Sequence, residues 1–486
     1  MSIHTRDPEQ RDQPTEKMFF CITLHVFSKL ATFAANSVTT FLTMKKQLSI
    51  KKGLSLPIAG ALEQWPSASA ITTVKTKRVA VIPDDYPGLA LKASVREGDR
   101  VEAGTPLLHD KNDADIAIVS PAAGSVEAIV RGERRKILRV VVDVDESGVK
   151  PVAVDTSDIR RALKLSGLWA QMRQLPYAIV PHSEKEPRDI FITGLDTAPL
   201  ATSLEKRVSS DALVRGIEIL SKLTKGKVYV SRGEGSEMPD IAGAVMVDIK
   251  GPHPAGNVGI MVNHIAPVNK GQTVWTLDIV TAARIGELFI NKGVARHTSL
   301  VAVTGPEVAA PRIVEALIGS EIKPILEKDL EGKRHHVRIV SGNLLTGVSV
   351  GTDGFLRFPW RQLTVIAEGD DIDEFMGWAT LSTKKMSFSR SFPGRFLHRL
   401  FRPDARLNGG RRAMIMSGVY DRVFPMDIMP EPLIKAFISK NLEKMEGLGG
   451  YEVAPEDFAL AEVIDPSKLE LQRIVREGLE YMRREL

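Results

Sequence analysis

Few residues in this chain have a type and spacing that could carry chemistry. Cys21 is the only cysteine, so the chain cannot by itself supply a disulfide, a thiolate zinc site or the ligands of an iron–sulfur cluster. His335 and His336 are neighbours on an expected strand, where consecutive side chains point to opposite faces, so they do not predict a shared metal. We therefore predict no catalytic residue and no metal site in this chain.

The segment 251–259, GPHPAGNVG, has the glycine content of a nucleotide-binding turn and follows an expected strand. Its spacing, G-x-x-x-x-G-x-x-G, differs from the dinucleotide fingerprint. Pro252 and Pro254 also lack the N–H donors that a phosphate would need. We interpret the segment as a rigid turn that faces a partner or ligand, with His253 as a turn residue rather than a catalyst.

The composition argues against several functions. At ~150 residues per domain, a chain of 486 residues predicts about three domains. Lys and Arg total 65 against 60 Asp and Glu, a net charge of +5, and the charges are mixed along the chain, so a nucleic-acid partner is not predicted. No long run of residues is apolar enough to span a bilayer, so we expect membrane contact to be peripheral or through partners.

Residues 1–43 differ in composition from the rest of the chain. A charged start precedes a moderately apolar run that is interrupted by His25, Lys29 and Asn36. The alternatives are a signal peptide, a membrane-surface helix, and a start codon assigned too early. We favour the last, with the chain proper beginning at Met44, and expect the extension to be disordered or untranslated.

Residues 44–150 predict an all-β domain, because short alternating apolar runs are separated by turn signals between 78 and 145. The pattern resembles the biotinyl/lipoyl β-sandwich. Carrier domains of that fold present a modified lysine on a tight hairpin. Lys111 lies in the corresponding stretch, but its distance to Ser120 is too long for that hairpin, so we expect an unmodified turn lysine.

From residue 151 the expected elements alternate between strand and helix, which is typical of a parallel sheet. The predicted fold class is therefore multidomain, α/β plus all-β. A Rossmann-like α/β domain is expected over 151–297. Residues 298–370 resemble a soluble-ligand-binding β-grasp (SLBB-like) domain, and residues 371–486 predict a mainly helical domain. The expected helices of the α/β domain are 158–167, 209–224 and 277–291, and its strands include 189–194, 227–231 and 242–249.

Seven sequence blocks resemble the A subunit of the sodium-translocating NADH:quinone reductases. They lie in the family's order and cover almost the whole chain beyond the N-terminal extension. The blocks are IKKGLSLPIAG, SGLWAQMRQLPY, IFITGLDTAPLA, GPHPAGNVG, VSGNLLTG, RVFPMDIMPEPL and EDFALAEVIDPSK. The domain order is also similar to the C subunit of Rnf-type reductases and, more distantly, to the flavin-binding subunit of complex I.

Those relatives hold redox centres, and one segment bears on whether this chain holds a flavin. Residues 166–177 stand where flavin-binding relatives have a glycine-rich loop. After Gly167 the glycines of that loop are replaced by larger residues here. Side chains at these positions would keep a flavin phosphate away from the backbone N–H groups. We therefore expect no flavin in this chain.

A second segment bears on an iron–sulfur cluster. The run FALAEVIDPSK resembles the ligand pattern C-x2-C-x3-C-P, with Phe458, Ala461 and Asp465 at the ligand positions. None of these supplies a thiolate, so we expect no cluster. The C-terminal domain would then be a degenerate ferredoxin-like domain held by an apolar plug, with Phe458, Leu460 and Val463 as candidates.

The family resemblance implies a peripheral subunit on the cytoplasmic side of a bacterial inner-membrane complex, a translocase in which this chain is not catalytic alone. Five other subunits, B to F, would oxidise NADH and hold FMN, FAD, riboflavin and iron–sulfur centres. The complex would reduce ubiquinone or ubisemiquinone to ubiquinol and move Na+ from cytoplasm to periplasm. Ubiquinone is the implied substrate, and the chain itself would bind no cofactor.

The apolar and singly cationic lining of the loop at 166–177 suits a neutral quinone ring. With the segment Ile82 to Leu89, it predicts a site in which Tyr86, Trp169 and Tyr177 pack on the ring and Arg173 donates a hydrogen bond to a carbonyl. The two loop aromatics are equally compatible with an ordinary core. Three alternatives remain: a flavin- or cluster-bearing dehydrogenase acting alone, a lipoyl- or biotin-type carrier, and a scaffold subunit whose complex binds quinone in one of its membrane subunits.

Overall fold

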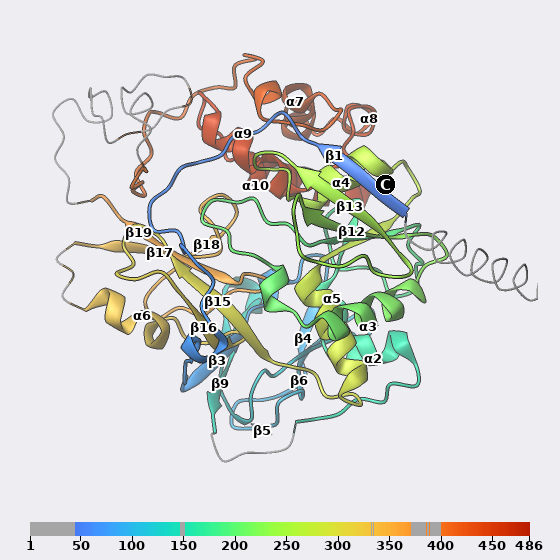
Figure 1. Cartoon of the computed structure of the whole chain (residues 1–486), viewed down its shortest axis with the longest axis vertical. Helices are drawn as coiled ribbons and strands as arrows, with labels where there is room; N and C mark the ends of the chain where they lie inside the picture. The colour runs from blue at the N-terminus through green and yellow to red at the C-terminus, as the bar shows by residue number, and fades with distance from the viewer. Residues whose placement is uncertain are drawn as a thin grey trace, which may run out of the picture.

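The computed structural model describes residues 44–145, 151–331, 333, 335–370, 385, 388 and 400–486. The described chain contains four sheets, with helices packed around them (Figure 1). The prediction of mixed α/β and all-β units with a helical C-terminal part is confirmed. The expectations for residues 1–43 lie outside the described ranges.

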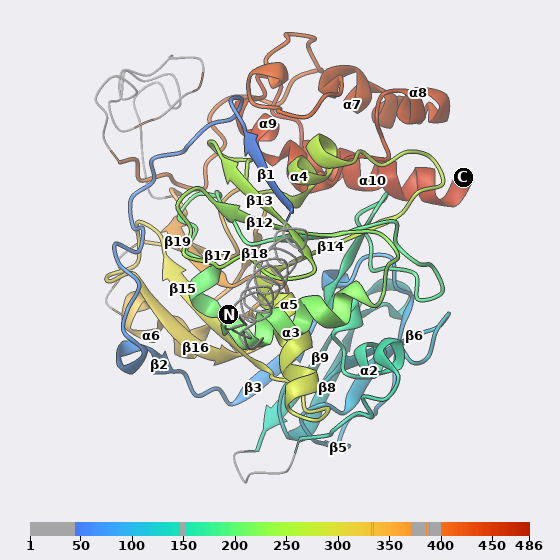
Figure 2. The same cartoon turned by 45° about the vertical axis from the view of Figure 1, so that its right-hand side comes forward.

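A mainly parallel six-stranded sheet organises the α/β part (Figure 2). In spatial order its strands are β1 (Met44–Ser49), β13 (Ala244–Lys250), β12 (Val228–Gly233), β11 (Ile190–Thr193), β14 (Val274–Asp278) and β10 (Arg173–Leu175). Neighbouring strands are parallel except β10, which is antiparallel to β14. Residues 44–49 were predicted to belong to the β-rich range 44–150, whereas they form an edge strand of this sheet.

Both faces of this sheet are buried, because successive side chains along a strand point to opposite faces. Ile190 and Ile192 of β11 face one core, which includes residues of α3 (Ser210–Ser221) and α5 (Ile279–Ile290). Phe191, between them, faces a second core with α4 (Val258–Ile265) and the C-terminal helices. In Figure 1 the two groups of helices accordingly lie on opposite sides of the sheet.

The helices α3 and α5 approach each other through two glycines. A Cβ atom on Gly286 would lie 1.8 Å from the carbonyl oxygen of Ala212, and one on Gly216 would lie 1.9 Å from that of Ala282. The obstacle in both cases is backbone, which cannot rotate away as a side chain can. The two helices therefore pack backbone against backbone only because both positions lack a side chain.

Gly286→Ala is expected to lower the free energy of unfolding by about 1–3 kcal/mol, although alanine is the better helix former by about 1 kcal/mol. Thermal unfolding followed by circular dichroism measures the change. The matched control is Gly447→Ala at the end of α8 (Leu442–Gly447), where nothing lies within 4 Å of the added Cβ. Equal melting temperatures for the two variants would contradict the proposed packing.

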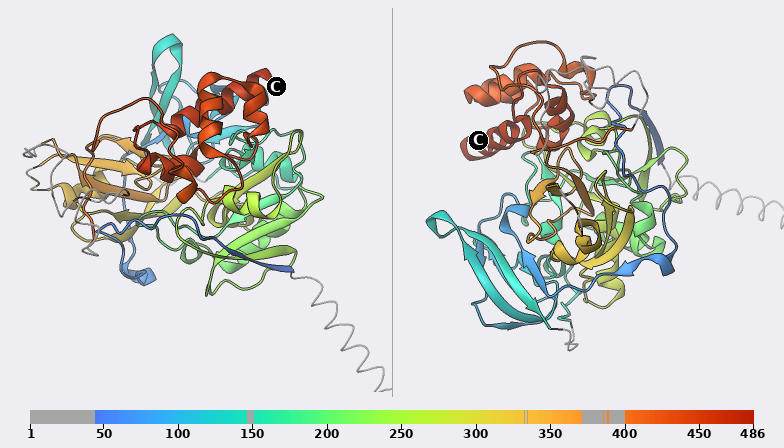
Figure 3. Two further views of the ribbon diagram at one scale, coloured as in Figure 1. Left: turned by 90° about the horizontal axis from the view of Figure 1, so that it is seen from above. Right: turned by 90° about the vertical axis from the view of Figure 1, so that its left-hand side faces the viewer.

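The β-rich N-terminal part has two small antiparallel sheets. One contains, in order, β3 (Arg78–Val81), β9 (Ile137–Val144), β8 (Gly124–Arg131) and β5 (Arg100–Val101), and the other β4 (Leu91–Ala93), β6 (Pro106–Asp110) and β7 (Ala117–Val119). The hairpin of β8 and β9 extends away from the rest of the molecule (Figure 3). Lys111 lies in an exposed turn directly after β6.

A second six-stranded sheet brings together segments far apart in the sequence. Its order is β18 (Val348–Val350), β17 (Val337–Ser341), β19 (Gln362–Ala367), β15 (Thr298–Thr304), β16 (Arg312–Leu317) and β2 (Thr72–Thr73). Ile325 and Leu326 of α6 (Lys323–Leu330) pack against this sheet. The short strand β2, from the range predicted as the first domain, completes its edge.

The C-terminal helices cover the second face of the parallel sheet. They are α7 (Pro430–Ser439), α8, α9 (Ala459–Ile464) and α10 (Leu471–Glu485). In α10 the residues Leu471, Val475, Leu479 and Met482 are buried at spacings of four and three, as its periodicity predicts. These four residues belong to the second core, which also contains residues of the parallel sheet.

Candidate functional site

A cavity of about 680 Å³ lies at the carboxyl ends of β11 and β14. Strand β11 has β12 on one side and β14 on the other. After β11 the chain adds β12 and β13 on one side and then crosses over to add β14 on the other side. In open α/β sheets, ligands bind in the crevice at such a switch point. Thr193 ends β11, Asp278 ends β14, and both residues line the cavity.

Every part of the described chain contributes to the wall of this switch-point cavity. Asp85 comes from the β-rich N-terminal part, and Asp278 from the α/β part. Phe358 and Trp360 come from the loop before β19 and form an aromatic wall, while Arg476 comes from α10. The cavity thus exists only when all these parts are assembled.

Asp278 has the strongest polar contacts at the floor of the cavity. Its Oδ1 accepts a hydrogen bond of 2.7 Å from the backbone N–H of Thr281, which caps α5. Its Oδ2 pairs with the guanidinium of Arg361. Burial alone would raise the pKa of Asp278, but Arg361 and the cap hydrogen bond outweigh it and hold the pKa below its ordinary value. Asp278 is therefore an anion at neutral pH.

The glycine-rich turn at 251–259 also lines the cavity, through His253, Gly256 and Asn257. His253 is 5 % exposed, and burial lowers its pKa to about 4, so its ring is neutral at pH 7. Its Nδ1 lies 3.2 Å from the hydroxyl of Thr197, while its buried Nε2 has no hydrogen-bond partner among the described residues. The turn that was predicted to face a partner or ligand thus lies in the wall of the cavity.

Arg173, a predicted site residue, lines the cavity. Its guanidinium donates hydrogen bonds to the backbone oxygens of Ala170, Met172 and Asp85, at 2.9, 2.9 and 2.8 Å. It also lies 5.8 Å from the ring centre of Phe358. Burial lowers the pKa of Arg173 to about 10, so the side chain stays charged at pH 7 and brings a cation to the aromatic wall.

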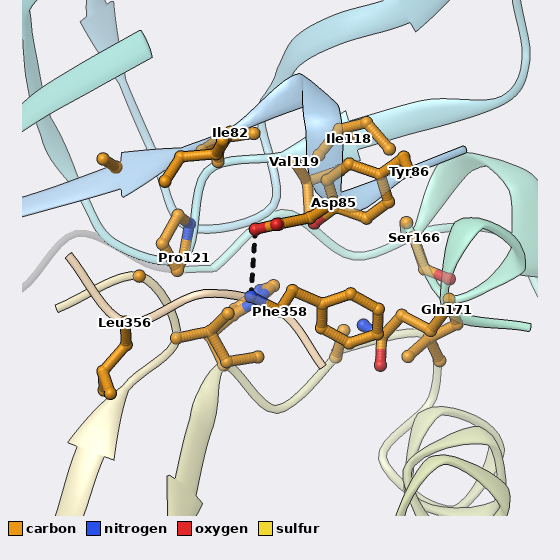
Figure 4. A pocket seen from close by; sticks show the side chains of 18 of the residues that line it. Ile82, Asp85, Tyr86, Ile118, Val119, Pro121, Ser166, Gln171, Leu356 and Phe358 are labelled. Carbon is orange, nitrogen blue, oxygen red and sulfur yellow. Dashed lines mark hydrogen bonds between the residues drawn. The ribbon is translucent and has the colours of Figure 1, made fainter. Parts of the chain in front are cut away.

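Tyr86 lies beside the cavity rather than in it. Its ring stacks on that of Phe358, with centroids 5.5 Å apart and planes 9° from parallel. Figure 4 shows both rings in a smaller cavity of about 40 Å³, which is also lined by Ser166 and Gln171 of the loop at 166–177. Asp85 reaches across this small cavity to accept a 3.0 Å hydrogen bond from the backbone N–H of Phe358.

The small cavity brings together the two segments that were predicted to form the quinone site, 82–89 and 166–177. Its volume is too small for a quinone ring, since an apolar cavity that holds benzene measures about 150 Å³. It shares Asp85 and Phe358 with the switch-point cavity. Of the two, only the switch-point cavity has room for a ring.

Trp169 and Tyr177 line neither of these two cavities. Trp169 is fully buried, donates its indole N–H to the oxygen of Pro181 at 2.9 Å, and packs edge-on against Trp275. Tyr177 is half-buried near Tyr451. Trp169 is thus a core aromatic, so we do not carry these two residues into the proposed site.

The three positions that were aligned with cluster ligands, Phe458, Ala461 and Asp465, are all buried. Phe458 and Ala461 are fully buried, and the ring of Phe458 lies 4.9 Å from that of Phe424. The carboxylate of Asp465 is buried and accepts hydrogen bonds from the backbone N–H groups of Ser467 and Leu469, at 3.1 and 2.8 Å.

The expected apolar plug needs one correction. Leu460 is buried as expected, but Val463 is 41 % exposed. Val463 lies near the end of α9, where its side chain is exposed although it is one turn from the buried Leu460. It therefore does not belong to the plug.

The adjacent histidines also differ from expectation, because they precede β17 rather than lying on it. His335 contacts Glu307 at 2.8 Å and His336 contacts Asp370 at 2.7 Å. Within the described ranges, no three His, Cys, Asp or Glu side chains are placed to hold a metal ion. The same ranges contain no helix long and apolar enough to cross a bilayer.

Most of the cavity wall was not predicted from the sequence. Phe358, Trp360 and Arg361 lie close together in a loop whose sequence has no periodicity or known motif. Arg207 and Arg476 come from distant helical segments. The only available signal was their arrangement in space, which a single sequence does not contain.

Comparison with known proteins defines the class first. The family model described as the NqrA N-terminal barrel-sandwich hybrid domain matches residues 48–145, that of the NqrA second alpha/beta domain matches 154–294, and that of the NQRA C-terminal domain matches 300–351. A barrel-sandwich domain followed by an α/β domain and a further β-rich domain therefore places the chain in the class of NqrA-type multidomain proteins.

Full-length relatives identify the family. The A subunit of the Na(+)-translocating NADH-quinone reductase of Histophilus somni (strain 129Pt) is 34 % identical, over 90 % of this chain and 100 % of the relative. The A subunit of Rhodopirellula baltica is 33 % identical, over 91 % of this chain and 99 % of the relative. That of Neisseria meningitidis serogroup B (strain ATCC BAA-335 / MC58) is 34 % identical, over 90 % of this chain and 100 % of the relative. The chain belongs to this family, the A subunits of Na(+)-translocating NADH-quinone reductases.

Proposed function

We propose that this subunit takes part in the reduction of ubiquinone or ubisemiquinone to ubiquinol, and that the quinone ring binds in the switch-point cavity. The subunit would lie peripherally on the cytoplasmic side of the bacterial inner membrane. Five partner subunits would oxidise NADH and carry FMN, FAD, riboflavin and iron–sulfur centres. Electron transfer through the whole complex would move Na+ from the cytoplasm to the periplasm.

The observation that carries this proposal is the combination of room, aromatic surface and a cation in one cavity. A volume of about 680 Å³ falls within the range of about 300–1,000 Å³ typical of small-molecule sites. Phe358 and Trp360 offer flat apolar surface for a ring. Arg173 lies against Phe358, close enough to the aromatic wall to donate to a carbonyl of the bound ring.

The charge of Arg173 suits the chemistry. Reduction of a quinone to a quinol adds two electrons, which the partner subunits would deliver, and two protons, and negative charge develops on the carbonyl oxygens as the electrons arrive. A guanidinium held rigidly beside such an oxygen stabilises the reduced form more than the oxidised one. The three backbone hydrogen bonds of Arg173 provide that rigidity.

The test is a titration of the purified full chain with a short-tailed ubiquinone, followed by tryptophan fluorescence or calorimetry. Trp360→Leu is expected to weaken binding about 3–10-fold, because a ring contact contributes about 0.5–1.5 kcal/mol. Arg173→Lys keeps the charge but loses the fixed fork of donors, and it should weaken binding of the reduced form more than that of the oxidised form.

The matched control is Arg139→Met, which removes an exposed arginine that also lies over a phenylalanine, Phe355, but outside the cavity. It should bind the quinone as the unmodified chain does. Circular dichroism confirms that each variant is folded. Unchanged affinity in folded Trp360→Leu and Arg173→Lys would overturn the site and favour the alternative, a cofactor-free scaffold whose complex binds quinone in one of its membrane subunits.

A further inference from the structure

Three arginines converge at one end of the switch-point cavity. Arg207 and Arg361 line it, and together with Arg284 they also line an adjoining cavity of about 20 Å³. Arg207 ends the short helix η5 (Glu205–Arg207), Arg284 lies in α5, and Arg361 immediately precedes β19. The fold thus gathers three cations from separate segments into a partly enclosed space.

Only one carboxylate forms an ion pair with this group in the described chain. Arg361 pairs with Asp278. Arg284 donates to neutral acceptors, the backbone oxygen of Thr298 at 2.9 Å and the amide oxygen of Gln171 at 3.5 Å. Its charge therefore has no direct counter-ion.

Arg207 is likewise held by neutral groups, because its guanidinium donates to the backbone oxygen of Leu300 and the hydroxyl of Thr202. Asp196 is exposed, lines the cavity and lies near Arg207, but the two side chains form no ion pair. Burial and then the charge of Arg361 lower the pKa of Arg207 to about 10. Arg207 and Arg284 thus form no ion pair in the described chain, although Glu287 lines the small cavity beside them and Asp196 lines the larger one.

Two donors in this group also lack acceptors. The Nε–H groups of Arg207 and Arg361 are buried, and neither has a hydrogen-bond partner among the described residues. A buried donor without an acceptor costs about 1–3 kcal/mol. Both donors belong to side chains in the cavity wall, so a ligand oxygen placed there would remove the cost.

The start of helix α4 in the cavity wall is a further feature that suits an anion. Helix α4 begins at Val258, which lines the cavity together with Asn257, and the side chain of Asn257 does not cap the helix. The uncapped N–H groups of a helix start favour negative charge. The neutral His253, with its unpartnered Nε2, lies in the turn that leads to this helix.

We propose that the switch-point cavity binds a small molecule bearing an oxyanion, a phosphoryl or carboxylate group, which Arg207 and Arg361 hold. The oxyanion would accept hydrogen bonds from the two unpartnered Nε–H groups and pair with the guanidinium of Arg207, which forms no ion pair in the described chain. This ligand is distinct from the quinone, which has no anionic group. It would be held by the arginine side chains rather than by the rings of Trp360 and Phe358.

Calorimetry with the full chain tests the proposal, at constant ionic strength and with chloride as the reference anion. The probes are inorganic phosphate, pyrophosphate, ADP and citrate. At least one probe is expected to bind with 1:1 stoichiometry. Binding of the phosphates and ADP but not citrate assigns a phosphoryl ligand, and the reverse assigns a carboxylate. If no probe binds more tightly than chloride, the proposal is wrong.

Arg207→Met is expected to weaken the binding of the successful probe at least 10-fold. It should also raise the melting temperature of the ligand-free chain, because it removes a cation from a repulsive group. Arg215→Met is the matched control, since Arg215 is a surface residue of α3 paired with Glu218 at 2.6 Å, and it should change neither quantity. Unchanged probe affinity in Arg207→Met would overturn the assignment.

A second variant and a second ligand keep the result interpretable. Arg361→Lys retains the charge beside Asp278 but removes the Nε–H donor, so it should weaken the probe by a smaller factor while remaining folded. The quinone titration is repeated on both variants. Loss of probe binding with intact quinone binding supports the anion site, and the reverse outcome overturns it without affecting the quinone site.

Discussion

Replacing Asp278 with alanine is expected to lower the free energy of unfolding by about 3–5 kcal/mol, the usual cost of removing one partner of a buried ion pair. Arg361, its partner, has a side chain only 9 % exposed. Without Asp278, this guanidinium and those of Arg207 and Arg284 would share a partly enclosed space in which none of the three has an ion-pair partner, because Glu287 in the same wall pairs with Arg296. The cap of α5 at Thr281 would be lost as well. Urea denaturation of the purified chain measures the effect.

Asp278→Asn separates charge from capping, because asparagine is also a good N-cap. We expect most of the loss to persist in Asp278→Asn, since the charge contributes more than the cap. Ser209→Ala is the cap-only control: Ser209 accepts the N-cap hydrogen bond of α3 from Ala212, and its loss should cost about 1 kcal/mol. Similar losses in Ser209→Ala and Asp278→Asn would contradict the buried-charge explanation.

The pH dependence gives an independent check on Asp278. Its pKa in the folded chain lies below its ordinary value, so its contribution to stability is fully present above the unfolded-state pKa of about 4. That contribution is lost as the pH falls through the folded-state pKa. The stability difference between the unmodified chain and Asp278→Asn should therefore shrink in acid and stay constant from pH 6 to pH 8.

Asp457 is expected to give the opposite pH dependence. It lies in the short helix η9 (Pro455–Phe458), is 2 % exposed, and accepts one backbone hydrogen bond, 2.9 Å from the N–H of Ala454. Its other oxygen is buried without a partner among the described residues. Burial, with a further contribution from the charge of Glu456, raises the pKa of Asp457 to about 8. Asp457 is therefore protonated in the folded chain at pH 6.

A raised carboxyl pKa means that the folded chain binds the proton more tightly than the unfolded chain. The stability that Asp457 contributes is fully present below the unfolded-state pKa and is lost as the pH rises through about 8. Between these limits the free energy of unfolding should fall by up to about 1.4 kcal/mol per pH unit from this group. Denaturation curves at pH 5, 6, 7 and 8 measure the slope.

Asp457→Asn should flatten that slope, because the amide does not titrate, and should make the variant the more stable protein at pH 8. The exposed Asp421 offers a matched control, and Asp421→Asn should keep the slope of the unmodified chain. A slope that survives in Asp457→Asn would show that another group is responsible.

Periodicity and capping predicted the local elements well. The helices at 158–167, 209–224 and 277–291 contain α2 (Ile159–Leu165), α3 and α5, and Gly167 has the left-handed φ of +78° expected at the end of α2. The strands of the parallel sheet were recognisable because both of their faces are buried, which produces continuous apolar runs. These signals are local, so one sequence is sufficient to detect them.

Pairings between distant segments were not predictable in the same way. The edge strands β1 and β2 come from a region that otherwise forms the barrel-sandwich. Yet β1 completes a sheet whose other strands all lie after residue 172, and β2 completes one whose other strands all lie after residue 297. The predicted quinone residues show the same limit. Trp169 and Arg173 are four residues apart, but the first is in the core and only the second reaches the cavity.

Residue types at given positions in the chain were enough to recognise the family. The prediction that this chain holds neither a flavin nor a cluster rests on residue types as well. Where a ligand has room emerged only from the folded chain. The switch-point cavity is formed by side chains from distant parts of the described chain, because folding brings the carboxyl ends of β11 and β14, the loop before β19 and helix α10 together. The energy of such a site depends on distances and burial, which a linear sequence does not specify.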